Sequence, residues 1–439
     1  MTSLNNPCDP SSVSAAHPAP RRHRFNISSF KLTALECDLF SCFHIYIYLQ
    51  IFNTYTELAV ISIHIKKLII ILISIYSLQS YPAFIRGKAA SVKLFLGYES
   101  AIEYWRAVGS GLAPRPKPSP ITRVSGEMTS ATSIIEALPN LRIGNCAPTH
   151  ALVSRKSRSY RSDNVVHHVC SGELPSGSFS DVSNRVIVAS PALCLLHAAQ
   201  HTKPSRLLPL IELCFEMLGG YSLCEGTKRG FVNHAPFLTK AEIDAFLRGL
   251  LPHTRGKRAL MRALRYALPN SRSPRETEAA LLLTLPEQFG GYAFPSPTLN
   301  FKVHLSEQDR RLTDKECFYL DLYWEGTLAA FEYDGADHSD PEQIAEDKAR
   351  RNLLSTMGFR LIVVEKAHAG DIRTFNQQIA QLARLIGVEV AGVNRETTGR
   401  RTRLMKYLFN PQHLAQCTYT RPLRLETQAP VQTVSTELF

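Results

Sequence analysis

Residues 317–338 read CFYLDLYWEGTLAAFEYDGADH, and this stretch decides the fold of the C-terminal half of the chain. Apolar residues alternate with other residues along Cys317–Trp324, which is the period-2 pattern of a half-buried strand. Glu325-Gly326 is a turn candidate, and the segment Thr327–Asp334 then runs back. The pattern therefore predicts a β-hairpin.

The predicted hairpin carries three acidic side chains on one face. Because side chains alternate between the two faces of a strand, Asp321, Glu332 and Asp334 project from the same side. If Trp324 faces Thr327, Asp321 lies one diagonal step from Glu332, a backbone separation of roughly 7–8 Å. Like charges this close are unfavourable unless a cation lies between them, and Mg²⁺ and Ca²⁺ prefer oxygen ligands. A second interpretation stays open, in which the acids form an ordinary solvated face.

A further acidic residue lies at the start of a predicted helix. The sequence Ser273-Pro274-Arg275-Glu276 fits a capping box, with proline at the first helical position. The helix continues through residues 279–283 and ends before Pro286. Glu276 is therefore either a capping residue or a member of the same site as the acidic hairpin.

Three more elements follow the hairpin. Ser339-Asp340-Pro341 starts a second helix, which Gly358 ends. Phe359–Val364 is a short apolar run suited to a buried strand, and Ile372–Ile386 is an amphipathic helix. The order helix, acidic hairpin, helix, strand, helix predicts an α/β core within residues 251–390.

The order of these motifs resembles that of a known group of nucleases. Ten residues separate Asp321 from Glu332-x-Asp-Gly-x-x-His, which is followed by Asp347-x-x-Arg350 and by Gly358. Together with Ser-Pro-x-Glu, this order over residues 273–388 resembles the endonuclease-like domain related to very-short-patch repair (Vsr) nucleases. That domain belongs to the PD-(D/E)XK restriction-endonuclease-like superfamily.

The resemblance implies a metal-dependent DNA endonuclease or nickase that uses Mg²⁺ or Mn²⁺. Asp321 and Glu332 would be the metal ligands, and Glu276 would assist from its helix. The superfamily usually has a lysine where this chain has Asp334, although the resembling domains often show that aspartate. His338 would then accept a proton in place of the lysine. The alternative is a non-catalytic DNA-binding or regulatory protein that retains the nuclease fold.

Residues 92–250 are predicted to form a separate α/β domain, with short strands and helices at residues 165–169, 186–188, 192–200 and 207–218. Ser190-Pro191 starts the first of these helices. Strands followed by Ser-Pro and a helix, just upstream of a nuclease-like domain, resemble AbiEi-like antitoxin proteins of bacterial abortive-infection systems. This chain has His197 where that helix usually has an acidic residue.

Charge and length indicate the class of partner. A chain of 439 residues is expected to hold two or three domains. Its net charge of +12 favours an anionic partner, and nucleic acid, expected to be DNA, fits the nuclease interpretation. Residues 391–439 are predicted to be a basic tail in which Arg400, Arg401 and Arg403 would bind phosphates without sequence preference. An exposed basic tail without a ligand is the alternative.

Cysteine spacing and the N-terminal region bear on location. The ten cysteines show no paired CxxC spacing, so no zinc site is predicted. No secretory signal is evident, and a reducing cytoplasm is expected. Residues 1–91 form an atypical extension that is expected to be partly disordered or to precede the true translation start. Lys66 and Lys67 interrupt the apolar segment 58–76, so no membrane anchor is expected. The sequence does not indicate the oligomeric state.

Overall fold

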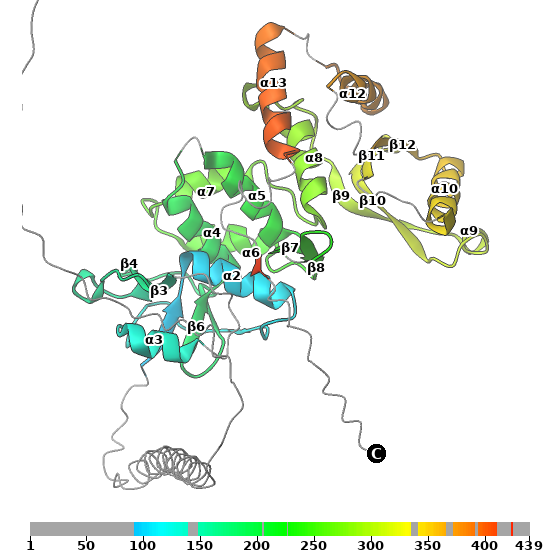
Figure 1. Ribbon diagram of the computed structural model, residues 1–439. Helices are drawn as coiled ribbons and strands as arrows, with labels where there is room; N and C mark the ends of the chain where they lie inside the picture. The colour runs from blue at the N-terminus through cyan, green and yellow to red at the C-terminus, as the bar shows by residue number, and fades with distance from the viewer. Residues whose placement is uncertain are drawn as a thin grey trace, which may run out of the picture. The chain divides into compact units, whose positions relative to one another are not determined.

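A computed structural model describes residues 92–138, 148–203, 206–225, 227–334, 341–365, 372–390, 394–410 and 423–424. The chain divides into two compact units, Met1–Gly87 and Lys88–Phe439, and every described residue belongs to the second. The predictions for residues 1–91 therefore lie outside the described residues. No helix in the described ranges is long and apolar enough to cross a membrane. The predicted α/β class is confirmed, because helices accompany mixed sheets throughout the second unit (Figure 1).

The first sheet contains six strands in the order β2-β5-β6-β1-β3-β4. Strand β1 pairs in parallel with β6, and β3 pairs in parallel with β4, while the other pairs are antiparallel. The strands are β1 (Leu94–Leu96), β2 (Lys117–Pro118), β3 (Thr149–Val153), β4 (Val165–Val169), β5 (Phe179–Asp181) and β6 (Val186–Ala189). The predicted strands at 165–169 and 186–188 are β4 and β6.

The helices of this part of the chain pack on the sheet and on one another. The helices are α2 (Tyr98–Gly109), α3 (Ala131–Ala137), α4 (Pro191–Gln200), α5 (Leu207–Leu218), α6 (Lys240–Gly249) and α7 (Lys257–Leu264). Helix α7 contacts α4 and α5, and its buried Leu260 and Ala263 join their apolar core. The domain boundary predicted between residues 250 and 251 therefore falls inside one helical layer, because the apolar face of α7 has its packing partners upstream.

A buried ion pair links α2 to α5. Arg106 donates from Nε and Nη2 to the two carboxylate oxygens of Glu216, each at 2.8 Å, and both side chains are almost fully buried. Glu216 also accepts from the backbone N–H of Leu223 at 3.1 Å, at the start of the small sheet of β7 (Tyr221–Glu225), β8 (Phe231–Asn233) and β13 (Leu423–Arg424). Each buried charge is thus compensated by an opposite charge, and the two helices and β7 are fixed together.

The second sheet has four strands in the order β12-β11-β10-β9. The strands are β9 (Thr298–His304), β10 (Cys317–Trp324), β11 (Ala329–Asp334) and β12 (Arg360–Glu365). The first three form an antiparallel meander, and β12 lies parallel to β11. The accompanying helices are α8 (Pro274–Thr284), η5 (Glu287–Phe289), α9 (Glu307–Arg310), α10 (Pro341–Thr356) and α12 (Ile372–Ile386). The predicted order of elements is thus present, with one strand, β9, that the sequence analysis did not predict.

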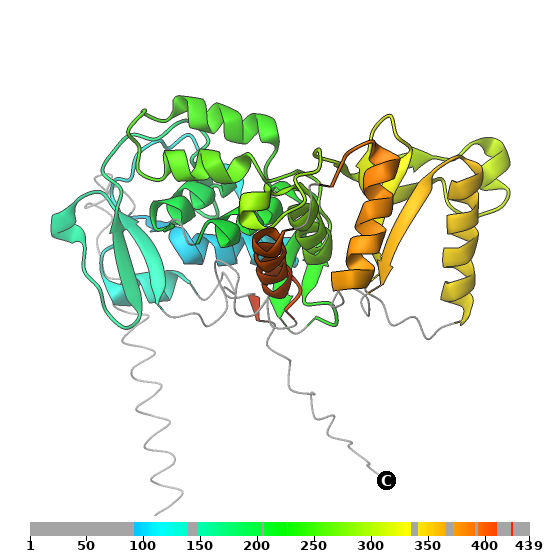
Figure 2. The same ribbon diagram turned by 90° about the horizontal axis from the view of Figure 1, so that it is seen from above.

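Helices α10 and α12 cover opposite faces of this sheet (Figure 2). Leu353 and Leu354 of α10 pack with Tyr323, whereas Phe375 of α12 packs with Phe331. The face of the hairpin that carries the acidic residues is therefore also a packed face rather than an entirely solvated one.

The hairpin differs from the prediction in its register. Trp324 pairs with Ala329, and not with Thr327 as predicted. The turn is longer because Gly326 and Leu328 both adopt positive φ angles, of 79° and 58°, and the Thr327 hydroxyl donates to the Trp324 carbonyl at 2.7 Å. The register shift is two residues, so the predicted faces are kept. Continued along the strands, it places Asp321 directly opposite Glu332, rather than diagonally.

The first part of the predicted basic tail belongs to the fold. Residues Arg395–Leu408 form helix α13, which begins at the N-cap Asn394 and contacts α8 and η5. Its apolar side chains Leu404, Met405 and Leu408 are buried. A chain segment that buries such a face is not a free tail.

Stacked rings surround a strained residue at the start of α2. Tyr98 has a φ angle of 49°, in a region that bulky residues seldom occupy. Its ring stacks between His168 and His197, with centroid distances of 3.7 and 4.2 Å, and its hydroxyl donates to Gln200 at 2.7 Å. The backbone N–H of Tyr98 donates to His197 Nδ1 at 3.3 Å. His197 is thus a buried core residue that supports this backbone conformation.

Burial lowers the pKa of His197 to about 3, from an ordinary value near 6.5. As pH falls below 6.5, the unfolded chain takes up a proton at this residue, whereas the folded protein does not. The free energy of unfolding should therefore fall between pH 6.5 and pH 3, by up to about 1.4 kcal/mol per pH unit for this residue.

We expect His197→Asn, which keeps an acceptor for the Tyr98 N–H, to lower stability at pH 8 but to flatten this pH dependence. Urea denaturation at pH 8 and pH 5, with wild type beside the variant, measures both effects. An equally steep loss in the variant would show that His197 does not control the acid response.

Candidate functional site

The site is built from the start of α8 and the middle of the second sheet. Ser273 is the N-cap of α8, and its hydroxyl accepts from the Glu276 N–H at 3.1 Å. The Glu276 carboxylate does not close the predicted capping box. Instead it accepts from the backbone N–H of Arg272 at 2.7 Å and from Asn300 Nδ2 at 2.5 Å. Glu276 is therefore held toward the sheet.

Asn300 connects Glu276 to the sheet. It lies in β9 with a φ angle of 51°, a left-handed conformation that asparagine tolerates better than most residues. Its side-chain amide also donates to the Asn270 carbonyl at 2.9 Å. The register of β9 and β10 places Asn300 opposite Asp321, which in turn lies opposite Glu332. Asn300, Asp321 and Glu332 thus form a row across three strands.

The structure brings together three of the predicted catalytic residues: Glu276, Asp321 and Glu332, hereafter the acidic cluster. Asp321 is partly exposed, but protein atoms exclude most water from its carboxylate. This desolvation, together with the negative charges of Glu276 and then Glu332, raises the pKa of Asp321 well above its usual range. Burial raises the pKa of Glu276 as well, against the hydrogen bonds that it accepts. The cluster therefore resists carrying its full negative charge.

One cation compensates part of this charge. Arg350 of α10 donates to both oxygens of Glu332, from Nη1 at 2.9 Å and from Nη2 at 2.5 Å. Its Nη2 also donates to the Tyr319 carbonyl at 2.7 Å, which fixes the guanidinium against β10. A bidentate pair of this kind is strong and directional. Glu332 is thus neutralised, whereas Glu276 and Asp321 have no such partner among the ion pairs of the described residues.

The predicted metal ligands are close together but are not assembled into a complete site. Within the described ranges, no group of three or more histidine, cysteine, aspartate or glutamate side chains is arranged to hold a metal ion. The oxygens of Glu332 are engaged by Arg350. The carboxylates of Glu276 and Asp321 are hard oxygen donors that fit Mg²⁺ or Mn²⁺ in atom type and charge.

Two predicted catalytic residues cannot be placed in the cluster. Asp334 ends β11, where its backbone pairs with Glu365, and its side chain lies outside what the structure describes. His338 belongs to residues 335–340, which are also outside the described ranges.

The three predicted phosphate-binding arginines of α13 differ in their surroundings. Arg401 is 2% exposed, and its guanidinium carbon lies 3.8 Å from the centroid of the Tyr292 ring. Arg400 pairs with Glu396 one turn earlier. Arg403 is exposed. The prediction of three phosphate contacts is therefore inconsistent with Arg401, which is a core residue in this fold.

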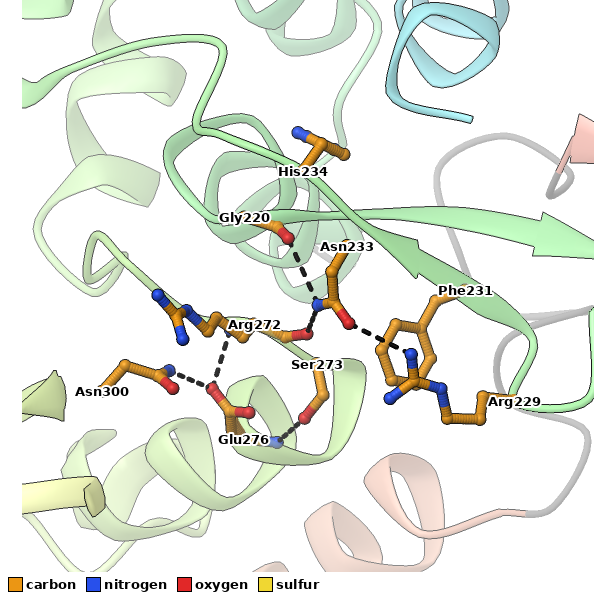
Figure 3. A pocket seen from close by; sticks show the side chains of 9 residues that line it. All are labelled: Gly220, Arg229, Phe231, Asn233, His234, Arg272, Ser273, Glu276 and Asn300. Carbon is orange, nitrogen blue, oxygen red and sulfur yellow. Dashed lines mark hydrogen bonds between the residues drawn. The ribbon is translucent and has the colours of Figure 1, made fainter. Parts of the chain in front are cut away.

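A cleft of about 490 Å³ adjoins the acidic cluster (Figure 3). It lies between the β7–β8 hairpin and the start of α8, and the sequence analysis did not predict it. We call it the arginine cleft. The residues that line it include Arg229, Asn233, His234, Arg272, Glu276 and Asn300. Comparisons of the chain with models of protein families, with curated proteins and with solved structures gave no match.

Asp321 allows a test of the charge balance. Because its pKa in the folded protein lies above that in the unfolded chain, the free energy of unfolding falls as pH rises between these two values, and the loss persists at pH 8. Asp321→Asn removes this penalty, and the amide oxygen can still accept from the Tyr333 N–H. We therefore expect the variant to melt at a higher temperature than wild type in EDTA at pH 8.

The same melting experiment should be repeated in Mg²⁺. A cation at ten times its dissociation constant adds about 1.4 kcal/mol of stability, so wild type should gain and Asp321→Asn should not. An equal gain in both proteins would place cation binding elsewhere.

Proposed function

We propose that the chain is a metal-dependent nucleic-acid endonuclease or nickase, with DNA as its substrate. The observation that carries this proposal is the acidic cluster, in which three carboxylates converge and, among the described residues, only Glu332 forms an ion pair, with Arg350. A divalent cation would supply the missing positive charge, lower the pKa of a bound water and stabilise charge on the phosphate. Glu276 and Asp321 would hold it, with Glu332 joining them when it separates from Arg350.

The residues of the chain support this chemistry in distinct ways. Asn300 and the Arg272 N–H orient the Glu276 carboxylate without neutralising it. Asp321 has a raised pKa and would lose its proton as positive charge arrives. Arg350, once separated from Glu332, would be a donor for a phosphate oxygen. These roles are the basis for expecting hydrolysis of a phosphodiester.

The partner, the cellular location and the biological role are parts of the same proposal. The net charge of +12 favours an anionic polymer as the partner. A cytoplasmic location agrees with the unpaired state of all five cysteines in the described ranges. A role in bacterial defence or DNA repair rests on the resemblance to Vsr-like and AbiEi-like proteins.

A second candidate function is binding without cleavage, as in a regulatory or antitoxin-like protein. The observation that favours it is the bidentate Glu332–Arg350 pair, which occupies a predicted metal ligand. The aspartate at position 334, where the superfamily usually has lysine, points the same way.

A plasmid-nicking assay separates the two functions. We expect wild type to relax supercoiled DNA in Mg²⁺ or Mn²⁺, and Asp321→Asn and Glu332→Gln to be slower by at least about 100-fold, because each removes one charge of the cluster. Glu325→Gln is the matched control, since Glu325 lies exposed in the turn of the same hairpin and bonds to Thr298.

If wild type leaves the plasmid intact in both metals yet retards it on a gel, the binding function is correct. If both cluster variants nick as fast as Glu325→Gln, the acidic cluster is not the active site.

A further inference from the structure

The arginine cleft combines residues from two distant parts of the sequence. Arg229, Asn233 and His234 come from the β7–β8 hairpin, whereas Arg272, Glu276 and Asn300 come from the start of α8 and from β9 (Figure 3). One wall thus belongs to the region before the acidic cluster, and the other wall contains a member of that cluster. A ligand in the cleft would contact both.

Hydrogen bonds hold the two walls in a fixed relation. Asn233 Nδ2 donates to the carbonyls of Arg272 at 2.5 Å and of Gly220 at 3.3 Å. The Gly220 N–H donates to the Ser271 carbonyl at 2.7 Å. A Cβ atom on Gly220 would lie 2.8 Å from the His234 carbonyl oxygen, so only glycine allows this close approach. The two walls of the cleft are therefore joined by close backbone contacts, and not only by surface side chains.

The two arginines are exposed and are stacked on aromatic rings. The Arg229 guanidinium carbon lies 4.8 Å from the centroid of the Phe231 ring, and the Arg272 carbon lies 4.3 Å from that of Tyr319. Arg229 Nη2 donates to the neutral Asn233 Oδ1 at 3.2 Å. Across the described residues, neither guanidinium forms an ion pair with a carboxylate. Stacking fixes the plane of a guanidinium and leaves its N–H edge available for a bidentate oxyanion.

His234 is not available as a ligand. Its Nε2 bonds to the Ser222 hydroxyl at 2.8 Å, and its Nδ1 bonds to the Ala235 carbonyl at 2.7 Å. Both ring nitrogens are therefore used within the hairpin. The positive charge that the cleft offers to a ligand comes from Arg229 and Arg272.

We propose that the arginine cleft binds backbone phosphates of the nucleic acid through Arg229 and Arg272, and thereby positions the strand beside Glu276 and Asp321. This inference rests on the proposed function for the identity of the ligand, but it requires neither metal nor cleavage. Arg229 and Arg272 are positioning residues. The β7–β8 hairpin thus completes the substrate site of the endonuclease-like region.

The test measures binding without cleavage. A fluorescent DNA duplex is titrated with the full chain in EDTA, by anisotropy, over a range of salt concentrations. Each lost phosphate contact lowers the slope of log affinity against log salt by about 0.9. We therefore expect Arg229→Ala/Arg272→Ala to lower the slope by about 1.8 and to weaken binding to all sequences alike.

The control removes the same charge elsewhere. Arg185 and Arg311 are exposed and do not line the cleft, so Arg185→Ala/Arg311→Ala should keep the wild-type slope. Arg229→Lys/Arg272→Lys should restore most of the slope, because lysine keeps the charge, but not the full affinity, because it loses the bidentate geometry. Melting curves of all variants exclude unfolding as the cause.

The outcomes separate this inference from the proposed function. If wild type nicks DNA but Arg229→Ala/Arg272→Ala binds DNA as wild type does, the cleft does not bind phosphates, whereas the proposed function of the acidic cluster is unaffected. If wild type does not nick DNA but the alanine double variant shows the smaller salt slope, the proposed cleavage is wrong and phosphate binding in the cleft is supported. Absence of DNA binding by wild type in EDTA, an equal loss in the control pair, or equally tight binding of a glutamate oligomer would each overturn the inference.

Discussion

Negative charge at one point of the second sheet is the constraint on which the rest of the site depends. Glu276, Asp321 and Glu332 converge there, and carboxylates so close together cannot all be ionised without a positive partner. Arg350 supplies one such partner through its bidentate contact with Glu332. Burial of Asp321, together with the negative charges of Glu276 and Glu332, raises the pKa of Asp321. A proton on Asp321 removes part of the remaining negative charge, and under the proposed function a divalent cation would take the place of that proton.

The surrounding structure relieves this excess of negative charge only in part, because the hydrogen bonds to Glu276 and the charge of Arg272 oppose the effect of burial on the pKa of Glu276. Asn300 holds a left-handed conformation in β9 so that its amide reaches Glu276, and the amide carries no charge. The Arg272 guanidinium lies over the Tyr319 ring, its backbone N–H donates to Glu276, and the residue lines the neighbouring cleft. The two arginines of the cleft would attract a phosphate, and the carboxylates beside them would attract a divalent cation. Under the proposed function, one metal-bound nucleic acid would contact both charged surfaces.

Much of this could be predicted from the sequence, because it depends on local periodicity. The alternation along 317–324 predicted the strand and its acidic face, and Ser-Pro predicted the start of α8. Strand β9 was missed although Leu299, Phe301 and Val303 alternate in the same way. The hairpin register was wrong by two residues, since a turn with Leu328 at positive φ has no sequence signature. The Glu332–Arg350 pair and the cleft join residues far apart in the chain, so local patterns could not predict them.

The central claim is that the acidic cluster binds a divalent cation, and that this cation displaces a proton from Asp321. It is tested most directly by isothermal titration calorimetry of Mn²⁺ into the full chain, in two buffers of different ionisation enthalpy. The account predicts saturable binding whose apparent enthalpy depends on the buffer, because Asp321 releases part of a proton as the cation arrives. Absence of saturable binding, or binding with the same enthalpy in both buffers, would contradict it.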